Sequence, residues 1–125
     1  MICLLVDDSR SARNLIKSYV SEIKLSQKCD FLEAANGEEA LRIIQLHHVD
    51  IVLLDWNLSS YMTGLDVLKV IRQLDKCKKI PVIMVTGEGD RQNVIGSLKC
   101  GANDFIIKPI DKKLLTDKIL KILTK

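Results

Sequence analysis

The sequence predicts one α/β domain in which a five-stranded parallel sheet carries helices on both faces. Short, almost continuous apolar runs recur along the 125 residues, and a stretch with helical periodicity follows each of them. Such apolar runs are typical of strands that are buried on both faces of a parallel sheet. Strict alternation of strand and helix implies right-handed crossovers and therefore helices on both faces. We expect residues 1–125 to form a single domain, because this length supports one hydrophobic core.

The first half of the chain predicts two strands and two helices. The run ICLLV at 2–6 is the first strand, and Ser9 can cap the helix that follows it. The apolar positions of that helix recur at helical spacing and are Ala12, Leu15, Ile16, Tyr19, Val20 and Ile23. The second strand, CDFLEA at 29–34, contains polar residues, so we expect it nearer an edge of the sheet. The second helix should cover 37–47.

The middle of the chain predicts two strongly buried strands. They are IVLL at 51–54 and PVIMV at 81–85. The helix between them carries Leu65, Leu68 and Ile71 at helical spacing. These two strands should lie inside the sheet, because apolar residues occupy consecutive positions in both.

The last part of the chain predicts a weak helix, a strand and a strong helix. The weak helix at 91–100 is interrupted by Gly96, and we expect it to be the most mobile of the five. The strand is FII at 105–107. The final helix follows Pro109 and ends in lysines, which suit a helix C-terminus.

Composition excludes several classes of protein. No apolar run approaches the roughly 18 to 20 residues needed to span a membrane, so we expect a cytoplasmic protein without membrane insertion. The four cysteines form no C-x-x-C pair, which disfavours a zinc or redox motif and indicates reduced thiols. The net charge of +3 comes from lysines that are spread over helices with few aromatic residues among them. This pattern does not favour nucleic-acid binding.

Polar residues stand where the predicted strands end. The first strand is followed by Asp7 and Asp8, the third by Asp55, the fourth by Thr86 and the fifth by Lys108. In an open α/β sheet these positions are the carboxyl ends of the strands, where ligands bind. Each residue alone could simply cap a helix or a loop. Together they place three carboxylates, a hydroxyl and an ammonium at one edge of the sheet.

This set of side chains predicts Mg²⁺-dependent phosphoryl transfer. Three neighbouring carboxylates repel one another unless a cation lies between them. Mg²⁺ prefers such oxygen ligands, and no His or Cys belongs to the group. Phosphoryl transfer uses a metal, an ammonium and a hydroxyl together, because charge neutralisation supplies most of its catalysis. Asp55 would be the nucleophile.

The same motifs resemble those of a known family. The pair Asp7–Asp8, the run IVLLDWN with Asp55, the VTG with Thr86 and the IIKP with Lys108 are similar, in order and spacing, to the response-regulator receiver domain of the CheY-like chemotaxis type. The resemblance covers the whole chain. It implies a flavodoxin-like doubly wound sheet with strand order 2-1-3-4-5. It also implies a signalling switch of a two-component or phosphorelay system, in chemotaxis or motility among other pathways.

The resemblance assigns roles to individual residues. Asp8 and Asp55 are expected to bind Mg²⁺ directly, Asp7 directly or through water, and the backbone carbonyl of Asn57 completes the protein ligands. Lys108 is expected to contact a phosphoryl oxygen, and the receiver would catalyse only its own phosphorylation and dephosphorylation. The resemblance also favours a cis peptide between Lys108 and Pro109.

A switch and its partners are implied as well. Thr86 is expected to move its hydroxyl toward the phosphoryl group and draw its loop inward, after which the ring of Phe105 turns inward. Without the surrounding motif, a phenylalanine in a strand such as Phe105 is more often ordinary core. The output face would be the fourth helix, fifth strand and fifth helix. The donor would be a sensor histidine kinase or a phosphotransfer protein, acetyl phosphate can substitute, and the monomer would bind a downstream protein target.

The chain departs from the family pattern at two places. The loop NLSSYMTG, residues 57–64, lacks the usual proline and is one residue longer, so residues 58–63 should have their own shape. Phe105 lacks the hydroxyl that a tyrosine would carry. His47 and His48 could be proposed as a phosphotransfer pair, but their place at the end of a helix favours a structural role. Trp56, beside Asp55, is a built-in fluorescent reporter.

Two other functions compete with the receiver. An aspartyl-phosphate phosphohydrolase of the haloacid-dehalogenase type would also place Asp55 after a strand, but it would carry a second acid where this chain has Asn57. A receiver-like interaction module that is never phosphorylated would be expected to lose part of the acid, threonine and lysine set. A cysteine phosphatase is disfavoured, because no C-x5-R loop follows Cys3.

Overall fold

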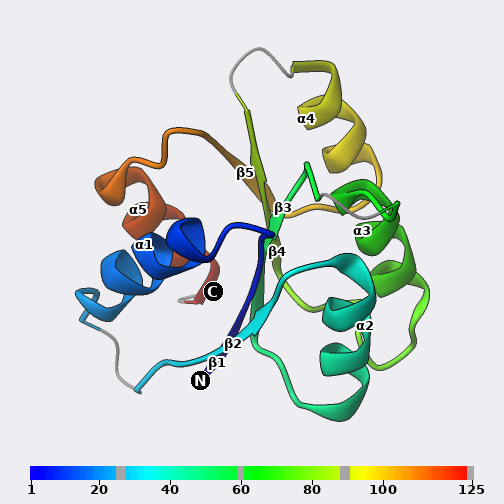
Figure 1. The fold of residues 1–125 in the computed structure, drawn as a ribbon, viewed down its shortest axis with the longest axis horizontal. Coiled ribbons are helices and arrows are strands. Elements are labelled where there is room, and N and C mark those ends of the chain that lie inside the picture. Colours follow the sequence, from blue (N-terminus) through cyan, green and yellow to red (C-terminus); the bar gives the residue numbers. More distant parts are fainter. Residues whose placement is uncertain (25–27, 59–60, 88–90, 124–125) are drawn as a thin grey trace.

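The computed structural model describes residues 1–24, 28–58, 61–87 and 91–123 and shows a doubly wound α/β domain (Figure 1). The strands pair in parallel in the order β2-β1-β3-β4-β5, as expected. Their bounds are β1 Ile2–Val6, β2 Asp30–Ala34, β3 Ile51–Asp55, β4 Val82–Thr86 and β5 Asp104–Ile107. The helices are α1 Arg10–Ser21, α2 Gly37–Leu46, α3 Gly64–Gln73, α4 Arg91–Lys99 and α5 Lys112–Leu123.

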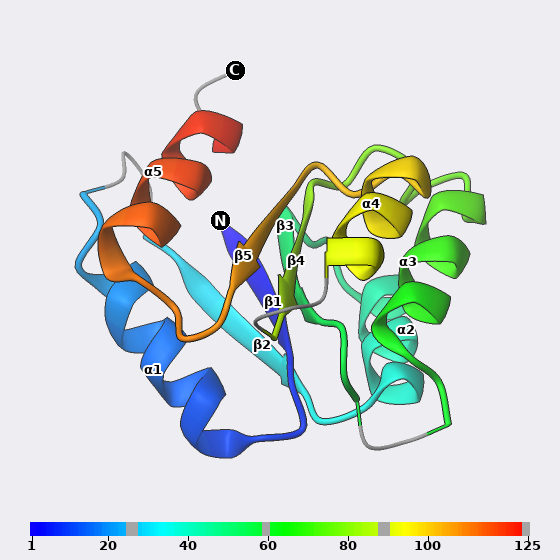
Figure 2. The ribbon, with the colours of Figure 1, turned by 90° about the horizontal axis from the view of Figure 1, so that it is seen from above.

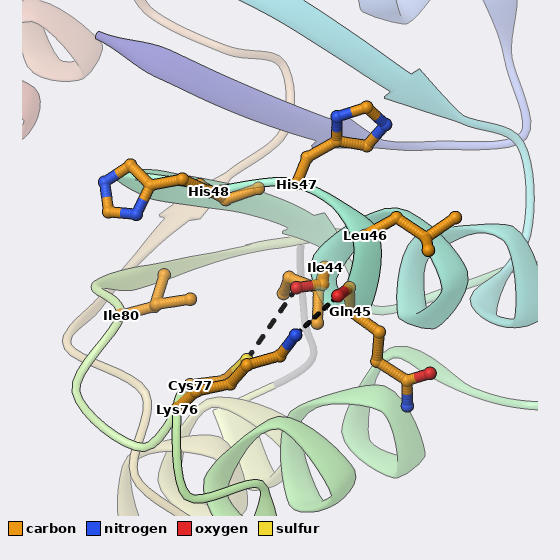
Figure 3. Close-up of a pocket in the computed structure, with 9 residues that line it drawn as sticks. Ile44, Gln45, Leu46, His47, His48, Lys76, Cys77 and Ile80 are labelled. Atoms are coloured by element: carbon orange, nitrogen blue, oxygen red, sulfur yellow. Dashed lines mark hydrogen bonds between the residues drawn. The ribbon is translucent and has the colours of Figure 1, made fainter.

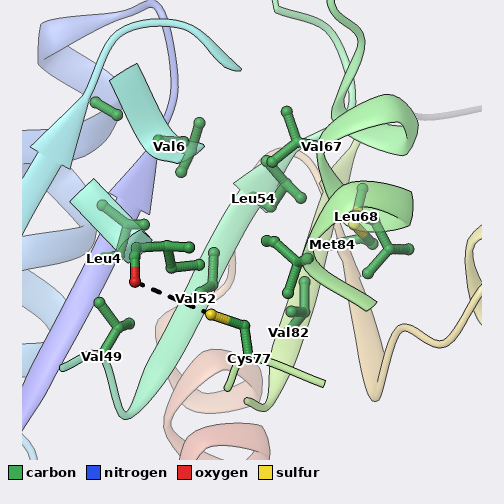
Figure 4. Packing of buried hydrophobic residues seen from close by; sticks show 14 of the residues in the cluster. Leu4, Val6, Val49, Val52, Leu54, Val67, Leu68, Cys77, Val82 and Met84 are labelled. Carbon is green, nitrogen blue, oxygen red and sulfur yellow. Dashed lines mark hydrogen bonds between the residues drawn. The ribbon is translucent and has the colours of Figure 1, made fainter. Parts of the chain in front are cut away.

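Helices cover both faces of the sheet. Helices α1 and α5 pack on one face, and α2, α3 and α4 lie on the other (Figures 1 and 2). Each face has its own apolar cluster. Figure 4 shows the cluster beneath α2 and α3, where side chains of the central strands, among them Leu54 and Met84, meet Val67 and Leu68 of α3. The cluster beneath α1 and α5 includes Leu5, Leu53, Ile83, Leu115 and Ile119.

Side-chain caps begin helices α1, α2 and α3. The Ser9 hydroxyl accepts a hydrogen bond from the Ala12 N–H, which confirms Ser9 as the N-cap of α1. Asn36 caps α2, and Thr63 caps α3 in a reciprocal capping box with Asp66. The apolar stripe of α1 is narrower than its sequence predicts, because Leu15 is 43% exposed.

The strand ends shift slightly from their predicted positions. Asp55 and Thr86 are the last residues of β3 and β4, whereas the sequence placed them just after these strands. Both continue the parallel pairing, Asp55 opposite Val85 and Thr86 opposite Ile107. The polar strand β2 lies at an edge of the sheet, as predicted. Helix α2 ends at Leu46 and α4 at Lys99, one residue before the expected ends.

Arg72 of α3 ties three segments together. Its Nε donates to the carbonyl of Gly101 at 2.9 Å, Nη1 to the carbonyl of Ile80 at 2.8 Å, and Nη2 to Oδ1 of Asn103 at 2.9 Å. Gly101 has a positive φ of 106°, and its Cα lies against the Arg72 side chain. One guanidinium therefore holds the turns that precede β4 and β5 against α3.

Candidate functional site

Three carboxylates meet at the carboxyl edge of the central strands. One oxygen from each of Asp7, Asp8 and Asp55 lies within 4.8 Å of the others. Asp7 and Asp55 are buried, at 3% and 4% exposure, and Asp8 is exposed. The parallel pairing of β1 with β3 brings the three residues together, because both strands end at the same edge. The cluster predicted from the sequence is therefore present in the fold.

Lys108 reaches this cluster from the end of β5. Its Nζ lies 3.3 Å from Oδ2 of Asp55 and 3.5 Å from Oδ2 of Asp7. The backbone N–H of Lys108 donates to the carbonyl of Thr86 at 2.7 Å and so fixes the start of the side chain beside β4. The peptide between Lys108 and Pro109 is cis, as the sequence resemblance favours.

The charges of the cluster are unbalanced. Burial raises the pKa of Asp55, and the charge of Asp7 raises it further, while Lys108 acts in the opposite direction. Burial lowers the pKa of Lys108, but the combined charges of Asp55 and Asp7 outweigh burial and raise it. Lys108 therefore stays protonated at neutral pH, yet one ammonium does not compensate three carboxylates.

Neighbouring groups hold the carboxylates in place. Oδ1 of Asp7 accepts a hydrogen bond from the Ser9 N–H at 2.8 Å, and Oδ1 of Asp55 accepts one from the Asn57 N–H at 3.3 Å. A guanidinium N–H of Arg13 donates to the carbonyl of Asp7. The role of the Asn57 carbonyl as a metal ligand stays a prediction.

Thr86 and Phe105 lie on the same face of neighbouring strands. Phe105 of β5 pairs with Met84 of β4, and Thr86 follows Met84 by two residues, so the three side chains share a face. Thr86 is buried, at 2% exposure. Phe105 is half-buried against the cluster under α2 and α3, with Nζ of Lys118 5.2 Å from the centre of its ring. Their movement on phosphorylation stays a prediction.

Gly64 is a site residue whose role was not evident in the sequence. A Cβ at this position would lie 2.2 Å from the carbonyl oxygen of Asp55 and 2.8 Å from Cα of Trp56. The Gly64 N–H also donates to the carbonyl of Trp56 at 2.9 Å. The start of α3 thus packs directly on the backbone of the predicted phosphoacceptor. Within the unusual loop, residues 59–60 lie outside the described residues, and Leu58 is buried.

The donor set fits Mg²⁺. The described residues offer carboxylate oxygens here and no imidazole or thiolate, which suits a hard cation. Such a cation would also supply the positive charge that the cluster lacks.

His47 and His48 lie far from this cluster, at the opposite edge of the sheet. They line a cavity of about 320 Å³ with Leu46, Lys76 and Cys77, where Lys76 donates to the carbonyl of Gln45 (Figure 3). The His47 N–H donates to the carbonyl of Ile43 at the end of α2, and Nε2 of His48 lies 2.9 Å from Oδ1 of Asp50. These contacts agree with the structural role expected for both residues.

Comparisons with known proteins identify the same family that the sequence motifs resemble. A model of the response regulator receiver domain matches residues 3–120. The chain is 37% identical over 124 residues to chemotaxis protein CheY1 of Helicobacter pylori, which covers 98% of this chain and 97% of that protein. It is 34% identical over 122 residues to chemotaxis protein CheY of Pseudomonas aeruginosa, covering 98% and 95%.

Solved structures that match this chain are likewise a receiver domain and a chemotaxis response regulator. The receiver domain of NtrX from Brucella abortus superposes with a TM-score of 0.86 at 27% identity and covers 98% of both chains. Chemotaxis response regulator CheY4 of Vibrio cholerae gives a TM-score of 0.85 at 26% identity, with 97% of both chains covered. In the described part of the chain, the helices are too short or too polar to cross a membrane. Sequence, fold and site together show that the chain belongs to the response regulator receiver domain family.

Proposed function

We propose that Asp55 accepts a phosphoryl group from a phosphohistidine and that this phosphorylation switches the protein between two signalling states. The observation that carries the proposal is the convergence of Asp7, Asp8, Asp55 and Lys108 at one edge of the sheet. Receiver domains act as phosphorylation-activated switches in two-component signalling, so the chain is a signalling protein and not a conventional enzyme.

The transfer step follows from the side chains. An oxygen of the Asp55 carboxylate attacks phosphorus and forms an O–P bond, while the N–P bond of the donor breaks and its electron pair returns to the imidazole, which takes up a proton. Lys108 lies within 3.3 Å of Asp55 and supports this step by holding a phosphoryl oxygen. Hydrolysis of the aspartyl phosphate by water would return the Asp55 carboxylate and release inorganic phosphate, so the receiver would catalyse its own dephosphorylation.

Receiver domains generally bind Mg²⁺ at an acidic pocket, and we assign that role here to Asp7, Asp8, Asp55 and the carbonyl of Asn57. The cation supplies positive charge at the developing phosphoryl oxygens. Asp7 is buried and held by the Ser9 N–H, whereas Asp8 is exposed and free to orient toward a cation. The two residues would therefore contribute differently, with Asp7 as the fixed ligand.

The switch would run from the phosphoryl group through Thr86 to Phe105. Their shared face of the sheet supports this route, because a shift of Thr86 toward Asp55 leaves space on the side where the Phe105 ring lies. The affected surface is made of α4, β5 and α5. It exposes Ile95, Leu98, Ile107 and Leu114, which suit contact with a protein target.

Members of this family interact with histidine kinases or phosphotransfer proteins and with downstream targets. For this chain we propose such a kinase or transfer protein as donor and a protein target as output, reached by the monomer in the cytoplasm. The likeness to chemotaxis proteins favours a target in motility.

Intact-mass analysis after incubation with acetyl phosphate and Mg²⁺ tests the proposal. We expect one added phosphoryl group on the native chain, and none on Asp55→Asn or in the presence of a chelator. Asp75→Asn is the matched control, because Asp75 is 95% exposed and follows the end of α3, so this variant should be labelled like the native chain.

Three outcomes would contradict the proposal. Equal labelling of Asp55→Asn would reject Asp55 as the acceptor. Continued release of phosphate from a phosphomonoester would indicate a phosphohydrolase, and no labelling with any donor would indicate an inert interaction module.

The variant Lys108→Ala tests the role of the lysine. We expect it to retain Mg²⁺ binding, which Trp56 fluorescence can follow, and to lose the conformational change that phosphorylation causes.

A further inference from the structure

An ammonium of α5 lies over the ring of Phe105 at the free edge of the sheet. Strand β5 is the last strand in the sheet order, and α5 packs on the face opposite to the apolar cluster that Phe105 joins. Nζ of Lys118 in α5 nevertheless lies 5.2 Å from the centre of the Phe105 ring. A side chain of α5 meets that ring only by passing round the open edge of β5, so the ring lies toward this edge.

Asp104 fixes the position of that ammonium. Its Oδ1 lies 2.6 Å from Nζ of Lys118 and also accepts the Phe105 N–H at 2.8 Å. The side chains of Lys118 and Asp104 are only 19% and 23% exposed, so water and salt screen this pair less than a surface pair. One carboxylate therefore holds both the backbone of Phe105 and the cation over its ring.

The contact between the ammonium and the ring favours one position of Phe105. The quadrupole of an aromatic ring attracts a cation that lies within about 6 Å of the ring centre, and the attraction is lost when the ring moves away. Asp104 retains Lys118 at the strand edge, so the ammonium does not follow a ring that turns inward. Because Phe105 has no hydroxyl, the cation supplies the polar contact of the ring at this edge.

We propose that Lys118, held by Asp104, is a positioning residue that keeps the Phe105 ring at the edge of β5 and thereby opposes the switch. The inference rests on the proposed function, in which the ring turns inward after phosphorylation. A contact that is made in only one of two states shifts the balance toward that state. Removal of the ammonium should therefore favour the inward position of the ring and ease formation of the phosphoryl-bound state.

A double-mutant cycle tests the contact itself, without a metal or a phosphoryl group. Lys118→Met removes the charge and keeps an unbranched side chain, and Phe105→Leu removes the ring. Urea unfolding in the presence of chelator measures the equilibrium constant of unfolding for each chain. Lys118→Met should raise this constant about two- to fivefold more in the native background than in Phe105→Leu, because only the native background contains the ring. Equal effects in the two backgrounds would overturn the contact.

Binding of beryllofluoride, a stable analogue of the phosphoryl group, tests the effect on the switch. With Mg²⁺ present and Trp56 fluorescence as the signal, Lys118→Met should bind beryllofluoride about two- to fivefold more tightly than the native chain. Asp104→Asn releases the ammonium and should change the affinity in the same direction. Lys118→Arg keeps a cation that can lie over the ring, so it should bind like the native chain.

Lys113→Met is the matched control. Lys113 also lies on α5 and pairs with a carboxylate, that of Asp117 at 3.5 Å, but its side chain is 87% exposed. Loss of the same charge there should leave the affinity for beryllofluoride unchanged. An equal rise in affinity in Lys113→Met would indicate an effect of net charge and overturn the role of Lys118. A Lys118→Arg variant that binds as tightly as Lys118→Met would overturn it as well.

The binding measurement also separates this inference from the proposed function. A native chain that does not bind beryllofluoride would contradict the proposed function and, with it, the opposition to the switch. A native chain that binds it, with an unchanged affinity in Lys118→Met, would overturn the role of Lys118 alone. A purely structural role of Lys118 would lower the stability of the fold without raising this affinity.

Discussion

Lys108 is central to the chemistry of the site at the scale of single residues. Its ammonium lies between two buried carboxylates, 3.3 Å from Asp55 and 3.5 Å from Asp7, while the side chain itself remains 36% exposed. A fully buried lysine would lose much of its charge to desolvation, whereas a fully exposed one would be screened by water. This intermediate burial keeps the ammonium charged and, under the proposed function, would let it reach an incoming phosphoryl group.

Gly64 is the residue whose replacement should disturb the site most directly without removing a polar group. In Gly64→Ala the new Cβ would lie 2.2 Å from the carbonyl oxygen of Asp55, so the start of α3 must move away from β3. We expect the free energy of unfolding to fall by about 1–3 kcal/mol, the usual cost of overpacking. Urea unfolding followed through Trp56 fluorescence measures this change.

Gly96→Ala is the matched control. A Cβ at Gly96 in α4 meets no atom within 4 Å, so the substitution adds helix propensity without a clash. It should stabilise the protein by up to about 1 kcal/mol. Equal effects of the two substitutions would show that close approach at Gly64 is unimportant.

At the scale of elements, Asp50 joins the starts of β1 and β3. Its Oδ2 accepts the Ile2 N–H at 2.7 Å, and its own N–H donates to the Ile2 carbonyl at 2.9 Å. Burial raises the pKa of Asp50, but the hydrogen bond from Ile2 and the contact with His48 together lower it below its usual value. A carboxyl group whose pKa is lowered on folding stabilises the fold above its unfolded pKa.

Asp50→Ala should therefore have a pH-dependent effect. At pH 7 we expect a loss of about 1 kcal/mol in the free energy of unfolding, since the Ile2 N–H loses a charged acceptor. The difference from the native chain should narrow as pH falls below about 4, through the lowered pKa of Asp50, because the native carboxylate becomes protonated there. Urea unfolding at several pH values measures this difference in the free energy of unfolding. A difference that stays constant from pH 7 to pH 3 would contradict a stabilising role of the Asp50 carboxylate. His48→Ala, which keeps the Ile2 contact, should have a smaller effect.

The sequence predicted well those elements that depend on residues close to one another in the chain. Apolar runs placed the strands to within one residue, and Ser9 was recognisable as a cap because its hydroxyl acts within its own turn. The proximity of Asp55 and Lys108 was predictable because strand ends converge on one edge. The order of the strands is not local information, and it came from the resemblance to a family.

Other features of the fold depend on contacts between distant segments. Nothing near Gly64 in the sequence indicates that the backbone of Asp55 passes 2.2 Å from its missing Cβ. Arg72 likewise looks like a helix-surface residue, although its partners lie at Gly101 and Asn103.

At the scale of the whole molecule, we expect stability and signalling to be coupled through the carboxylate cluster. Asp7 and Asp55 are buried close together, and Lys108 compensates them only in part, so the fold contains an unfavourable electrostatic contact in the absence of a cation. A cation that binds only the folded chain stabilises it by mass action. Under the proposed function, the stability of the domain should therefore report occupancy of the site.

Mg²⁺ should reverse the order of stability of the native chain and Asp55→Asn. With chelator, at constant ionic strength, the variant should be the more stable of the two, because burial and the charge of Asp7 raise the pKa of Asp55 and thus disfavour its ionised form. At Mg²⁺ concentrations about 100 times the dissociation constant, the native chain should gain about 2.7 kcal/mol, and the variant much less. The two stability curves, measured by urea unfolding, should cross as Mg²⁺ increases, and Asp75→Asn should follow the native curve throughout. Parallel curves for the native chain and Asp55→Asn would show that Asp55 does not bind the cation, and a variant no more stable than the native chain with chelator would show that Asp55 does not strain the metal-free fold.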